Sequence, residues 1–281
     1  MGNLLEGRPI AERIKNEIRD AITKINRPVV LASVHAGENG GADAYVKSQQ
    51  KTAKELGIIY QLHRLSGSVS EREIIECIRT LNADDSVNGI IIQMPLPSHI
   101  DYTKISAYIV PGKDVEGMCP ENIGKLLYGA PVVVPCTAAA VMEIIKSGGI
   151  DLYGKETVIV GHSEIVGKPL ALLLLEEFAT VTVCHIGTSK AGKLEEHVKK
   201  AEVLIVAAGH AGLIKGEWIK DGAVVIDVGI NKEKGKIVGD VEFETASQRA
   251  SWITPVPGGV GPLTVTMLMR NLISLVNTEK P

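Results

Sequence analysis

The chain contains two successive stretches in which short β-branched runs alternate with amphipathic helical patterns. In the first stretch, apolar runs at 28–37, 58–65 and 87–97 are separated by helical patterns at 42–57 and 68–82. Strands that are joined through helices lie parallel in one sheet, because the helical crossover returns the chain to the end of the sheet at which the previous strand began. The first stretch therefore predicts a parallel sheet with helices packed on it.

The second stretch begins after Gly154 and repeats the alternation. Its expected strands are 156–161, 179–185, 202–209 and 223–229, and its expected helices are 166–177 and 193–201. This pattern is typical of a Rossmann-type domain. An apolar helix at 263–277 is expected to pack back on the first domain. We predict a two-domain α/β protein with an N-terminal parallel-sheet domain and a Rossmann-type nucleotide-binding domain. The predicted boundaries are 1–137 plus 265–281 for the former and 138–264 for the latter.

Composition excludes several classes of function. The chain has 281 residues, which is long enough for two modest cores, and its net charge of −3 provides no basic field for nucleic acid or a membrane surface. Aromatic residues make up 4% of the chain, which also disfavours platforms for stacking bases. Composition therefore favours neither nucleic acid nor a membrane surface as a partner.

The cysteines and the apolar runs indicate the compartment. Four cysteines stand singly, without a CxxC pair or a Cys/His cluster of zinc spacing, so no metal is expected. This usage suits a reducing cytosol. The first ten residues carry charges, and the longest apolar run, 169–175, is too short to span a bilayer. The sequence predicts a soluble cytoplasmic protein.

The segment VIVGHSEIVGKPL (158–170) has the order of a strand, a glycine turn and a helix start. Gly161 permits a tight turn, Ser163 can donate to a phosphate or cap the helix, and Gly167 permits close backbone approach. The spacing is not GxGxxG, so this pattern alone leaves both a phosphate-binding turn and an ordinary βα turn open.

The choice of cofactor is also open on pattern alone. A Rossmann site for NAD usually has an acid at the end of the second strand, but VTVCHIG (181–187) holds neither an acid nor an arginine. His162 is the one nearby candidate for contact with a 2′-phosphate, and a free imidazole is mostly neutral at pH 7.

Nine segments, taken together in their order and spacing, resemble one family. They are YVKSQQKTAKELGI, GIIIQMPLP, PGKDVEGMCPENIGKL, PCTA, VIVGHSEIVGKPLALLLL, ATVTVCHIGT, VIDVGIN, GDV and TPVPGGVGPLTVTML. The chain resembles the methylenetetrahydrofolate dehydrogenase/methenyltetrahydrofolate cyclohydrolase family of the bifunctional FolD type over nearly its whole length. The resemblance implies two α/β domains with a cleft between them, a folate substrate, NAD or NADP as cofactor, and a homodimer.

The resemblance also implies roles for particular residues. Tyr45 would pack on the pterin, Gln93 would be the active-site glutamine, and Glu116 would accept hydrogen bonds from the pterin where the family usually has Asp. The backbone of Pro257, Gly258 and Gly259 would approach the substrate. The implied cofactor-binding residues are Gly161, His162, Ser163, Val166, Gly167 and Ile230.

Each of these residues also has a structural interpretation. Tyr45 on a half-buried helix is usually core, Gln93 at a strand end is usually a loop hydrogen-bonder, and acids in a glycine-flanked loop are usually solvated. Asp227 can cap a turn, and Thr137 is expected to cap the helix in 132–149.

One position departs from the family in a way that changes the expected chemistry. The family pattern after the tyrosine is YVxxKxK, and its first lysine carries the cyclohydrolase proton, whereas this chain has Gln49 there. Gln49 lies within about 40° of Tyr45 on a helix, while Lys47, Lys51 and Lys54 point about 120° or more away. Glutamine does not titrate near neutral pH. We therefore expect dehydrogenase activity with cyclohydrolase activity weak, absent or served by another group.

The cofactor end departs as well. The family's common GRS is GHS here, with His162, and its common CHSKT is CHIGT, with Ile186 and Gly187. Both changes remove partners for a 2′-phosphate and favour NAD, although NADP is the usual cofactor of the family.

Two other interpretations compete with this one. Another two-domain Rossmann dehydrogenase, of the shikimate or amino-acid type, needs a Lys/Asp pair, which Lys113 and Asp114 could supply. A folate- or nucleotide-binding regulator that has lost catalysis would bind ligands without turnover.

Overall fold

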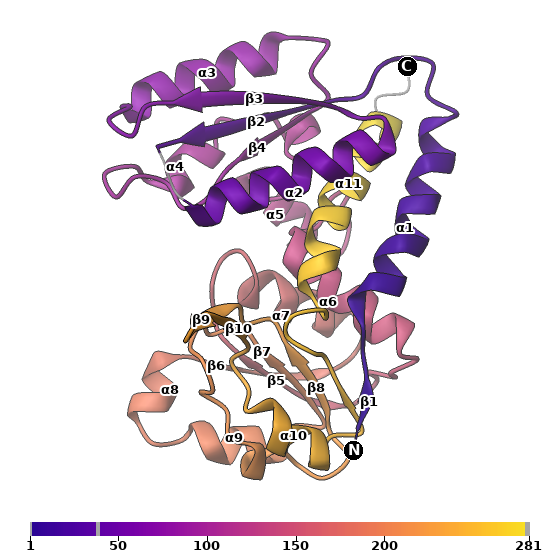
Figure 1. Ribbon diagram of the computed structural model, residues 1–281, viewed down its shortest axis with the longest axis vertical. Coiled ribbons are helices and arrows are strands. Elements are labelled where there is room, and N and C mark those ends of the chain that lie inside the picture. The colour runs from indigo at the N-terminus through magenta and orange to yellow at the C-terminus, as the bar shows by residue number, and fades with distance from the viewer. Residues whose placement is uncertain (1, 38–39, 279–281) are drawn as a thin grey trace. The chain divides into compact units, whose positions relative to one another are not determined.

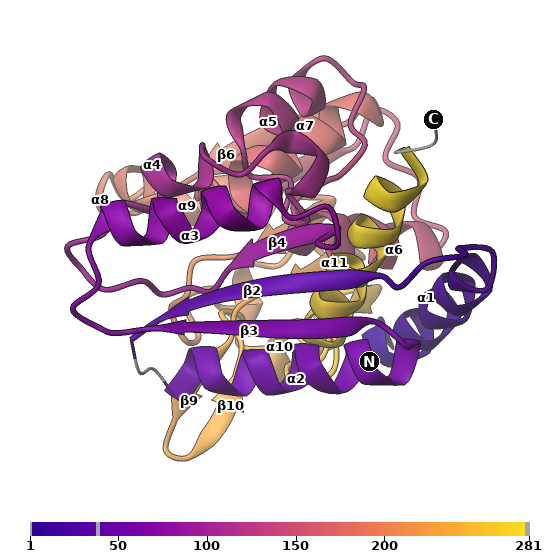
Figure 2. The ribbon, with the colours of Figure 1, turned by 90° about the horizontal axis from the view of Figure 1, so that it is seen from above.

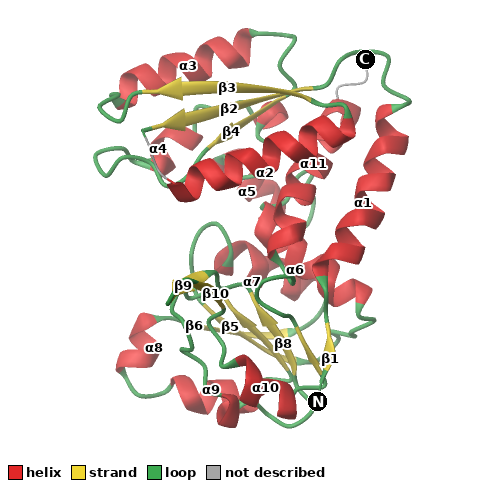
Figure 3. Ribbon diagram, viewed as in Figure 1, coloured by secondary structure: helices red, strands yellow, loops and turns green. Residues whose placement is uncertain are grey.

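The computed structural model describes residues 2–37 and 40–278. The chain divides into two compact units, each of them an α/β unit with its own sheet (Figures 1 and 3). The first unit comprises Arg13–Cys136 and Val265–Pro281, and the second comprises Met1–Glu12 and Thr137–Thr264. The prediction of a two-domain α/β fold with parallel sheets is confirmed.

The sheet of the first unit has three strands in the order β3-β2-β4, all parallel. The strands are β2 (Val30–Ala36), β3 (Ile59–Leu65) and β4 (Gly89–Ile92). Helix α2 (Gly40–Leu56) lies on one face of this sheet and α3 (Glu71–Ala83) on the other (Figure 2). The alternation of strands and helices read from the sequence therefore forms as predicted.

The two faces of β2 bury different side chains. Ala32 and Val34 belong to an aliphatic cluster that includes Ile74 and Ile78 of α3. Ser33 alternates with them along the strand and is fully buried on the face toward α2. Helix α3 begins with a capping box, in which Ser70 Oγ accepts from Glu73 N and Glu73 accepts from Ser70 N.

The C-terminal helix α11 (Gly261–Thr278) packs on the first unit, as expected from its apolar sequence. Asn271 Nδ2 donates to the carbonyl oxygens of Val115 at 2.9 Å and Val134 at 2.8 Å, so α11 is tied to two loops of that unit. The other helical segments that include residues of this unit are α1 (Gly7–Ile22), α4 (Tyr102–Ser106), η1 (Pro111–Lys113), α5 (Pro120–Leu127) and α6 (Cys136–Ser147). Helix α6 begins at Cys136, so Thr137 lies inside the helix and is not its N-cap.

The sheet of the second unit has six parallel strands in the order β1-β11-β8-β7-β5-β6. Its strands are β1 (Asn3–Leu4), β5 (Glu156–Val160), β6 (Thr180–Cys184), β7 (Val203–Val206), β8 (Val224–Asp227) and β11 (Trp252–Ile253). The chain runs from β5 to β6 on one side of β5, and then crosses to β7 on the other side of β5. The gap between the carboxyl ends of β5 and β7 is therefore a topological switch point, where open α/β sheets bind ligands.

Helices and a hairpin complete the second unit. They are α7 (Gly167–Glu176), α8 (Ile186–Lys190), α9 (Leu194–Lys200), η2 (Gly216–Trp218), α10 (Phe243–Arg249) and the antiparallel pair β9 (Asn231–Glu233) and β10 (Lys236–Val238). Leu194 and Val198 of α9 share a buried cluster with Val158 and Val160 of β5. Within the two described ranges, no helix combines the length and the hydropathy needed to cross a membrane.

The N-terminal residues differ from the expected division of the chain. Residues 1–137 were expected in the first unit, but Met1–Glu12 group with the second. Strand β1 adds a parallel edge strand beside β11, and Gly7 N donates to Gly258 O at 2.9 Å. A two-residue strand carries too little periodicity to be recognised from sequence.

Candidate functional site

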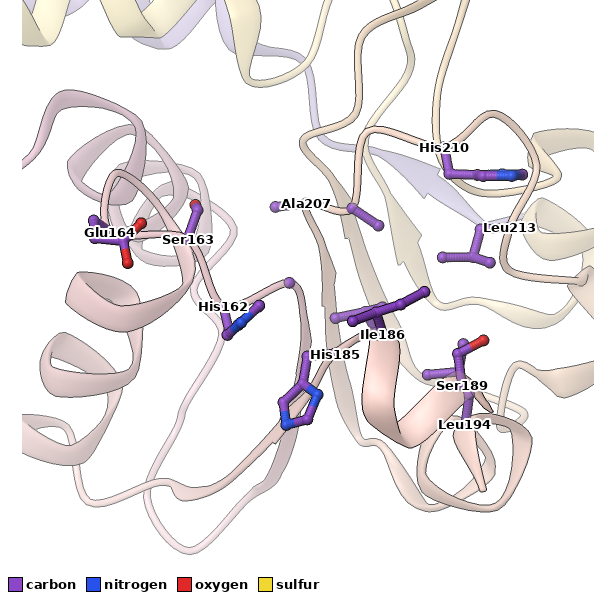
Figure 4. A pocket seen from close by; sticks show the side chains of 13 residues that line it. His162, Ser163, Glu164, His185, Ile186, Ser189, Leu194, Ala207, His210 and Leu213 are labelled. Atoms are coloured by element: carbon purple, nitrogen blue, oxygen red, sulfur yellow. The ribbon is translucent and has the colours of Figure 1, made fainter. Parts of the chain in front are cut away.

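A cavity of about 470 Å³ opens at the switch point of the second unit (Figure 4). Its wall combines the turn after β5, the start of α8 and the loop after β7. The lining residues that matter here are Gly161, His162, Ser163, His185, Ile186 and His210. Three of the predicted cofactor-binding residues therefore lie on one wall of one cavity.

Two glycines make the turn between β5 and α7 possible. Gly161 has φ +128°, a conformation that residues with a Cβ rarely adopt, and a Cβ there would overlap the carbonyl oxygen of Ala207. A Cβ on Gly167 would overlap the carbonyl oxygen of Gly161. The turn and the first residue of α7 thus approach each other more closely than any side chain allows.

The N-terminus of α7 lies next to this cavity. Ser163 Oγ accepts from Val166 N at 3.2 Å, which leaves the hydroxyl hydrogen of Ser163 able to donate. Val166 precedes the helix without a side-chain cap, and α7 runs for ten residues. Backbone N–H groups and the helix dipole therefore favour an anion such as a pyrophosphate at this end. The cavity and the turn fit a dinucleotide.

Two imidazoles stand where a 2′-phosphate partner would be expected. The ring centroids of His162 and His185 lie 5.0 Å apart. His185 Nδ1 accepts from Gly187 N at 3.0 Å and so caps α8. A Cβ on Gly187 would lie 2.9 Å from His185 Cε1, so the glycine allows this cap. Because Nδ1 accepts this hydrogen bond, Nε2 is the ring nitrogen of His185 that can donate in this arrangement.

The cavity wall contributes no fixed positive charge. Within the described part of the chain, neither lysine nor arginine lines the cavity, and the side chain that protrudes beside His185 is Ile186, which is 66% exposed. Lys168 is the nearest cation along α7, and it pairs with Glu164 at 2.7 Å.

A buried carboxylate fixes the opposite wall. Asp240 accepts from the backbone N–H groups of Ala208, Gly209 and His210 at 2.7–2.8 Å, and from Asn231 Nδ2 at 2.8 Å. These four donors hold the loop after β7 in place. The sequence analysis did not single out Asp240, although it lies in the GDV segment that contributed to the resemblance.

Asp227 at the end of β8 has a structural role. It accepts from the backbone N–H groups of Gly229, Asp240 and Val241 at 2.9–3.0 Å, which agrees with the expectation that it caps a turn. Burial raises the pKa of Asp227 to about 6, although the three N–H donors oppose this shift.

The remaining predicted residues of the second unit lie apart from the cavity wall. Gly258 has φ +119°, and Gly259 N donates to Pro255 O at 2.8 Å, so the PGG segment forms a tight turn after a cis Val256–Pro257 bond. Ile230 is 67% exposed and lies near Gly261.

The first unit carries a buried polar cluster beneath α2. Gln93 Nε2 donates to Gln49 Oε1 at 2.8 Å and to Ser33 Oγ at 3.0 Å, and Tyr60 Oη donates to the same Gln49 Oε1 at 2.6 Å. Ser33, Gln49 and Gln93 are fully or almost fully buried. The structure thus brings together two predicted residues, Gln49 and Gln93, with two that the sequence analysis missed.

The lysines of α2 lie on its outer surface. Lys47, Lys51 and Lys54 are exposed, whereas Gln49 is buried and Tyr45 is half-buried. The helical geometry deduced from the sequence is confirmed. None of these three lysines shares the side of the helix that holds Gln49.

Glu116 lies beside Tyr102, whose hydroxyl donates to Glu116 Oε2 at 3.4 Å. Burial, followed by the nearby Asp114 carboxylate, raises the pKa of Glu116 to about 8. Burial and these same two acids raise the pKa of Tyr102. The signal in the sequence for Tyr102 was weak, because it stands in a loop-rich segment 14 residues from Glu116.

Lys113 and Asp114 do not form a catalytic pair. Lys113 Nζ donates to the carbonyl oxygens of Leu81, Asn82 and Asp84 at the end of α3, at 2.7–3.1 Å. The carboxylate of Asp114 instead accepts from Cys119 N at 2.7 Å and Asn122 Nδ2 at 3.0 Å. Both residues hold the backbone in place, which removes the feature that favoured a different dehydrogenase.

Known proteins resemble this chain over both units. The catalytic domain of the tetrahydrofolate dehydrogenase/cyclohydrolase family matches residues 5–116, and the NAD(P)-binding domain of that family matches residues 135–280. The bifunctional protein FolD of Acetivibrio thermocellus is 48% identical over 280 residues, covering 98% of this chain and 97% of that protein.

Solved structures agree with the sequence matches. The bifunctional FolD enzyme of Campylobacter jejuni superposes with a TM-score of 0.94 at 42% identity, covering 99% of this chain and all of that one. The Trypanosoma brucei enzyme, described as complexed with NADP and an inhibitor, has a TM-score of 0.94 at 36% identity, with 99% and 98% coverage. This chain therefore belongs to the tetrahydrofolate dehydrogenase/cyclohydrolase family.

Proposed function

We propose that this chain oxidises 5,10-methylenetetrahydrofolate to 5,10-methenyltetrahydrofolate and passes the hydride to a nicotinamide cofactor. The observation that carries this proposal is the glycine-lined cavity at the β5/β7 switch point, in a chain of this family. Gly161, Ser163, Val166 and Gly167 would hold the pyrophosphate at the start of α7. A nicotinamide held there would supply the acceptor for the hydride.

The chain's own residues bind and orient the substrate. Tyr45 would pack on the pterin, Glu116 would accept from the pterin amino and ring N–H groups, and Pro257 to Gly259 would present backbone to the folate. Departure of the hydride leaves a cation that the substrate's own nitrogens stabilise. The step therefore depends on positioning more than on a titrating side chain.

Cyclohydrolase activity depends on a proton carrier, and we propose that this chain lacks an effective one. Gln49 stands where the family has its catalytic lysine, and its amide oxygen already accepts from Gln93 and Tyr60. An amide neither loses nor gains a proton near neutral pH. Opening of the methenyl ring would then be slow or absent in the protein itself.

We further propose a preference for NAD. His162 replaces the family's usual arginine, Gly187 replaces a lysine, and His185 is committed to capping α8. A 2′-phosphate would meet the apolar Ile186 and imidazole rings rather than the arginine and lysine that the family commonly has. We also expect a cytoplasmic homodimer, by analogy with the family.

The test is a spectrophotometric assay of the purified chain with methylenetetrahydrofolate and either NAD or NADP. Reduction of NAD with a higher kcat/KM than NADP supports the proposal. Reduction of neither cofactor, with folate and nucleotide still bound, would instead favour a binding protein that has lost catalysis. A much higher kcat/KM with NADP would contradict the cofactor preference alone.

A further inference from the structure

Four polar side chains from four elements meet in the core of the first unit. Ser33 comes from β2, Tyr60 from β3 and Gln49 from α2, and Gln93 directly follows β4. Ser33, Gln49 and Gln93 are at most 1% exposed, and Tyr60 is partly buried. Such burial of polar groups is unfavourable unless each group finds partners, so the arrangement of their hydrogen bonds is constrained.

Hydrogen bonds join the four side chains in the order Tyr60, Gln49, Gln93 and Ser33. Tyr60 Oη donates to Gln49 Oε1 at 2.6 Å, and the two hydrogens of Gln93 Nε2 point to Gln49 Oε1 at 2.8 Å and Ser33 Oγ at 3.0 Å. Every member therefore constrains the orientation of its neighbours.

These hydrogen bonds leave the two amide oxygens with different capacities to accept a further hydrogen bond. Gln49 Oε1 holds two donors and is saturated, whereas Gln93 Oε1 has one long contact, at 3.4 Å from Gln49 Nε2. Gln93 can therefore accept a further hydrogen bond, from water or substrate, and Gln49 cannot. Rotation of the Gln49 amide by 180° would place its NH₂ group against the donor hydrogens of Tyr60 and Gln93.

Tyr60 sets this orientation without exchanging its own proton. Burial raises the pKa of Tyr60 to about 12, so its hydroxyl stays protonated across the physiological range and remains a donor. It cannot serve as a substitute for the missing lysine. Its contribution is to hold Gln49, which in turn holds Gln93.

We propose that Tyr60 is a positioning residue for the dehydrogenase reaction, acting through Gln49 to fix the orientation of the Gln93 amide. The inference rests on the proposed function, because Gln93 is assigned to the active site by family membership. Tyr60 itself contacts neither substrate nor cofactor in this account.

The experiment measures kcat and the KM of each substrate for wild type and Tyr60→Phe, which keeps the ring and removes the hydroxyl. We expect kcat to fall about tenfold, the factor that one net hydrogen bond is worth. The KM for the nicotinamide cofactor should not change, since its site lies in the second unit. Tyr128→Phe is the matched control, because Tyr128 is 85% exposed in the same unit, and it should leave kcat unchanged.

A double-mutant cycle separates positioning from general stabilisation. In a Gln49→Met background, Tyr60→Phe should lower kcat no further, because the residue through which it acts is gone. An equal fold-change in both backgrounds, or an unchanged kcat in Tyr60→Phe, would overturn the proposal. If Tyr60→Phe fails to fold, Ser33→Ala is the second variant, because it removes the hydrogen bond that Gln93 Nε2 donates to Ser33 Oγ. It should lower kcat about threefold, with the same coupling to Gln49.

The outcome for wild type distinguishes the two proposals. If wild type oxidises methylenetetrahydrofolate and Tyr60→Phe has the same kcat, only the role of Tyr60 is contradicted. A wild-type chain that oxidises nothing with either cofactor contradicts the proposed function, and the positioning role fails with it.

Discussion

The amide nitrogen of Gln93 lies 2.8 Å from the amide oxygen of Gln49, and this hydrogen bond joins the end of β4 to the middle of α2. The family's proton-carrying lysine would occupy the position of Gln49. A titrating group would thus be replaced by one whose amide oxygen already accepts two hydrogen bonds, while the oxygen of Gln93, the glutamine proposed for the active site, accepts one long hydrogen bond at 3.4 Å. The central claim that follows is a dehydrogenase without effective ring opening.

Replacing Gln49 with lysine should restore ring opening. The new amine would stand among Tyr60, Ser33 and Gln93 without a carboxylate partner, and burial lowers the pKa of an unpaired amine. A neutral fraction near pH 7 could then take a proton from water. We expect hydrolysis of methenyltetrahydrofolate to rise about 10²-fold over wild type, the low end of general-base catalysis.

Gln50→Lys is the matched control for that variant, because Gln50 is the next residue and lies exposed on the outer surface of α2. The decay of methenyltetrahydrofolate absorbance measures both variants. Equal rates for Gln49→Lys, Gln50→Lys and wild type would show that the identity of residue 49 does not limit hydrolysis.

Folate binding should strengthen as the pH rises toward 8. The pKa of Glu116 is raised to about 8 from its ordinary value of 4.5, and pairing with the pterin requires the carboxylate form. Below pH 8 most of the free protein carries a protonated Glu116, so kcat/KM for methylenetetrahydrofolate should rise about tenfold per pH unit and level off above 8.

Glu116→Gln should remove that inflection and lower the plateau value. The same shift affects folding in the opposite direction. Because the folded pKa is raised, the stabilising contribution of Glu116 is present below about 4.5 and is lost as the pH rises through about 8. A pH profile of kcat/KM that is flat between 6 and 8 in wild type would contradict the assignment of Glu116.

The preference between cofactors should reverse with two substitutions. His162→Arg together with Gly187→Lys would introduce two cations beside the cavity and displace His185 from its cap. The ratio of kcat/KM for NADP to that for NAD should increase about 10²-fold, since a charge-assisted hydrogen bond contributes about 1.5–3 kcal/mol.

The control for that pair is His162→Arg with Gly187→Ala, which adds the same Cβ at residue 187 without the charge. It should lose the cap and gain less toward NADP. If the Gly187→Lys and Gly187→Ala variants have the same ratio of kcat/KM for NADP to kcat/KM for NAD, the cap determines the cofactor preference and the missing cation at residue 187 does not.

Gly167→Ala should abolish cofactor binding. The added Cβ would overlap the carbonyl oxygen of Gly161, so α7 and the turn must separate. We expect an increase of at least about 10²-fold in the Kd for NAD, and a loss of about 2–4 kcal/mol in the free energy of unfolding.

Gly124→Ala is the control, because Gly124 lies within α5 and its Cβ would meet no atom within 4 Å. It should be neutral or slightly stabilising. Isothermal titration with NAD and thermal unfolding measure both variants, and wild-type affinity in Gly167→Ala would contradict the close approach of α7 to the turn.

The strong periodic elements of the fold could be predicted from the sequence, and the weak ones could not. The alternation of apolar runs and helices predicted the long strands and most of the long helices within a few residues, because side-chain periodicity reports burial directly. The edge strand β1 and its neighbour β11 have two residues each and carry no recognisable periodicity. The assignment of Met1–Glu12 to the second unit depends on their pairing, so it was not available from sequence.

Residues of the candidate site could be predicted where they belong to a sequence motif. Residues that reach the site only through tertiary packing could not. Tyr45, Gln49, Gln93 and Glu116 were found through the family pattern. Tyr60 was not predicted, because its hydrogen bond to Gln49 depends on how β3 pairs with β2. The register between two parallel strands cannot be deduced from the sequence of either strand alone.

His185 illustrates the same limit at the cofactor end. His185 directly follows Cys184, and Cys184 is buried while His185 is exposed. The cap that His185 Nδ1 provides for α8 depends on the backbone N–H of Gly187, which the sequence does not place.

The central claim is tested most directly by two rates measured on one preparation of the unaltered chain. The first is the reduction of NAD by methylenetetrahydrofolate, and the second is the hydrolysis of methenyltetrahydrofolate compared with buffer alone. We predict a clear first rate and a second rate that does not exceed that of buffer. Hydrolysis well above buffer would contradict the account, since another group would then carry the proton that Gln49 cannot.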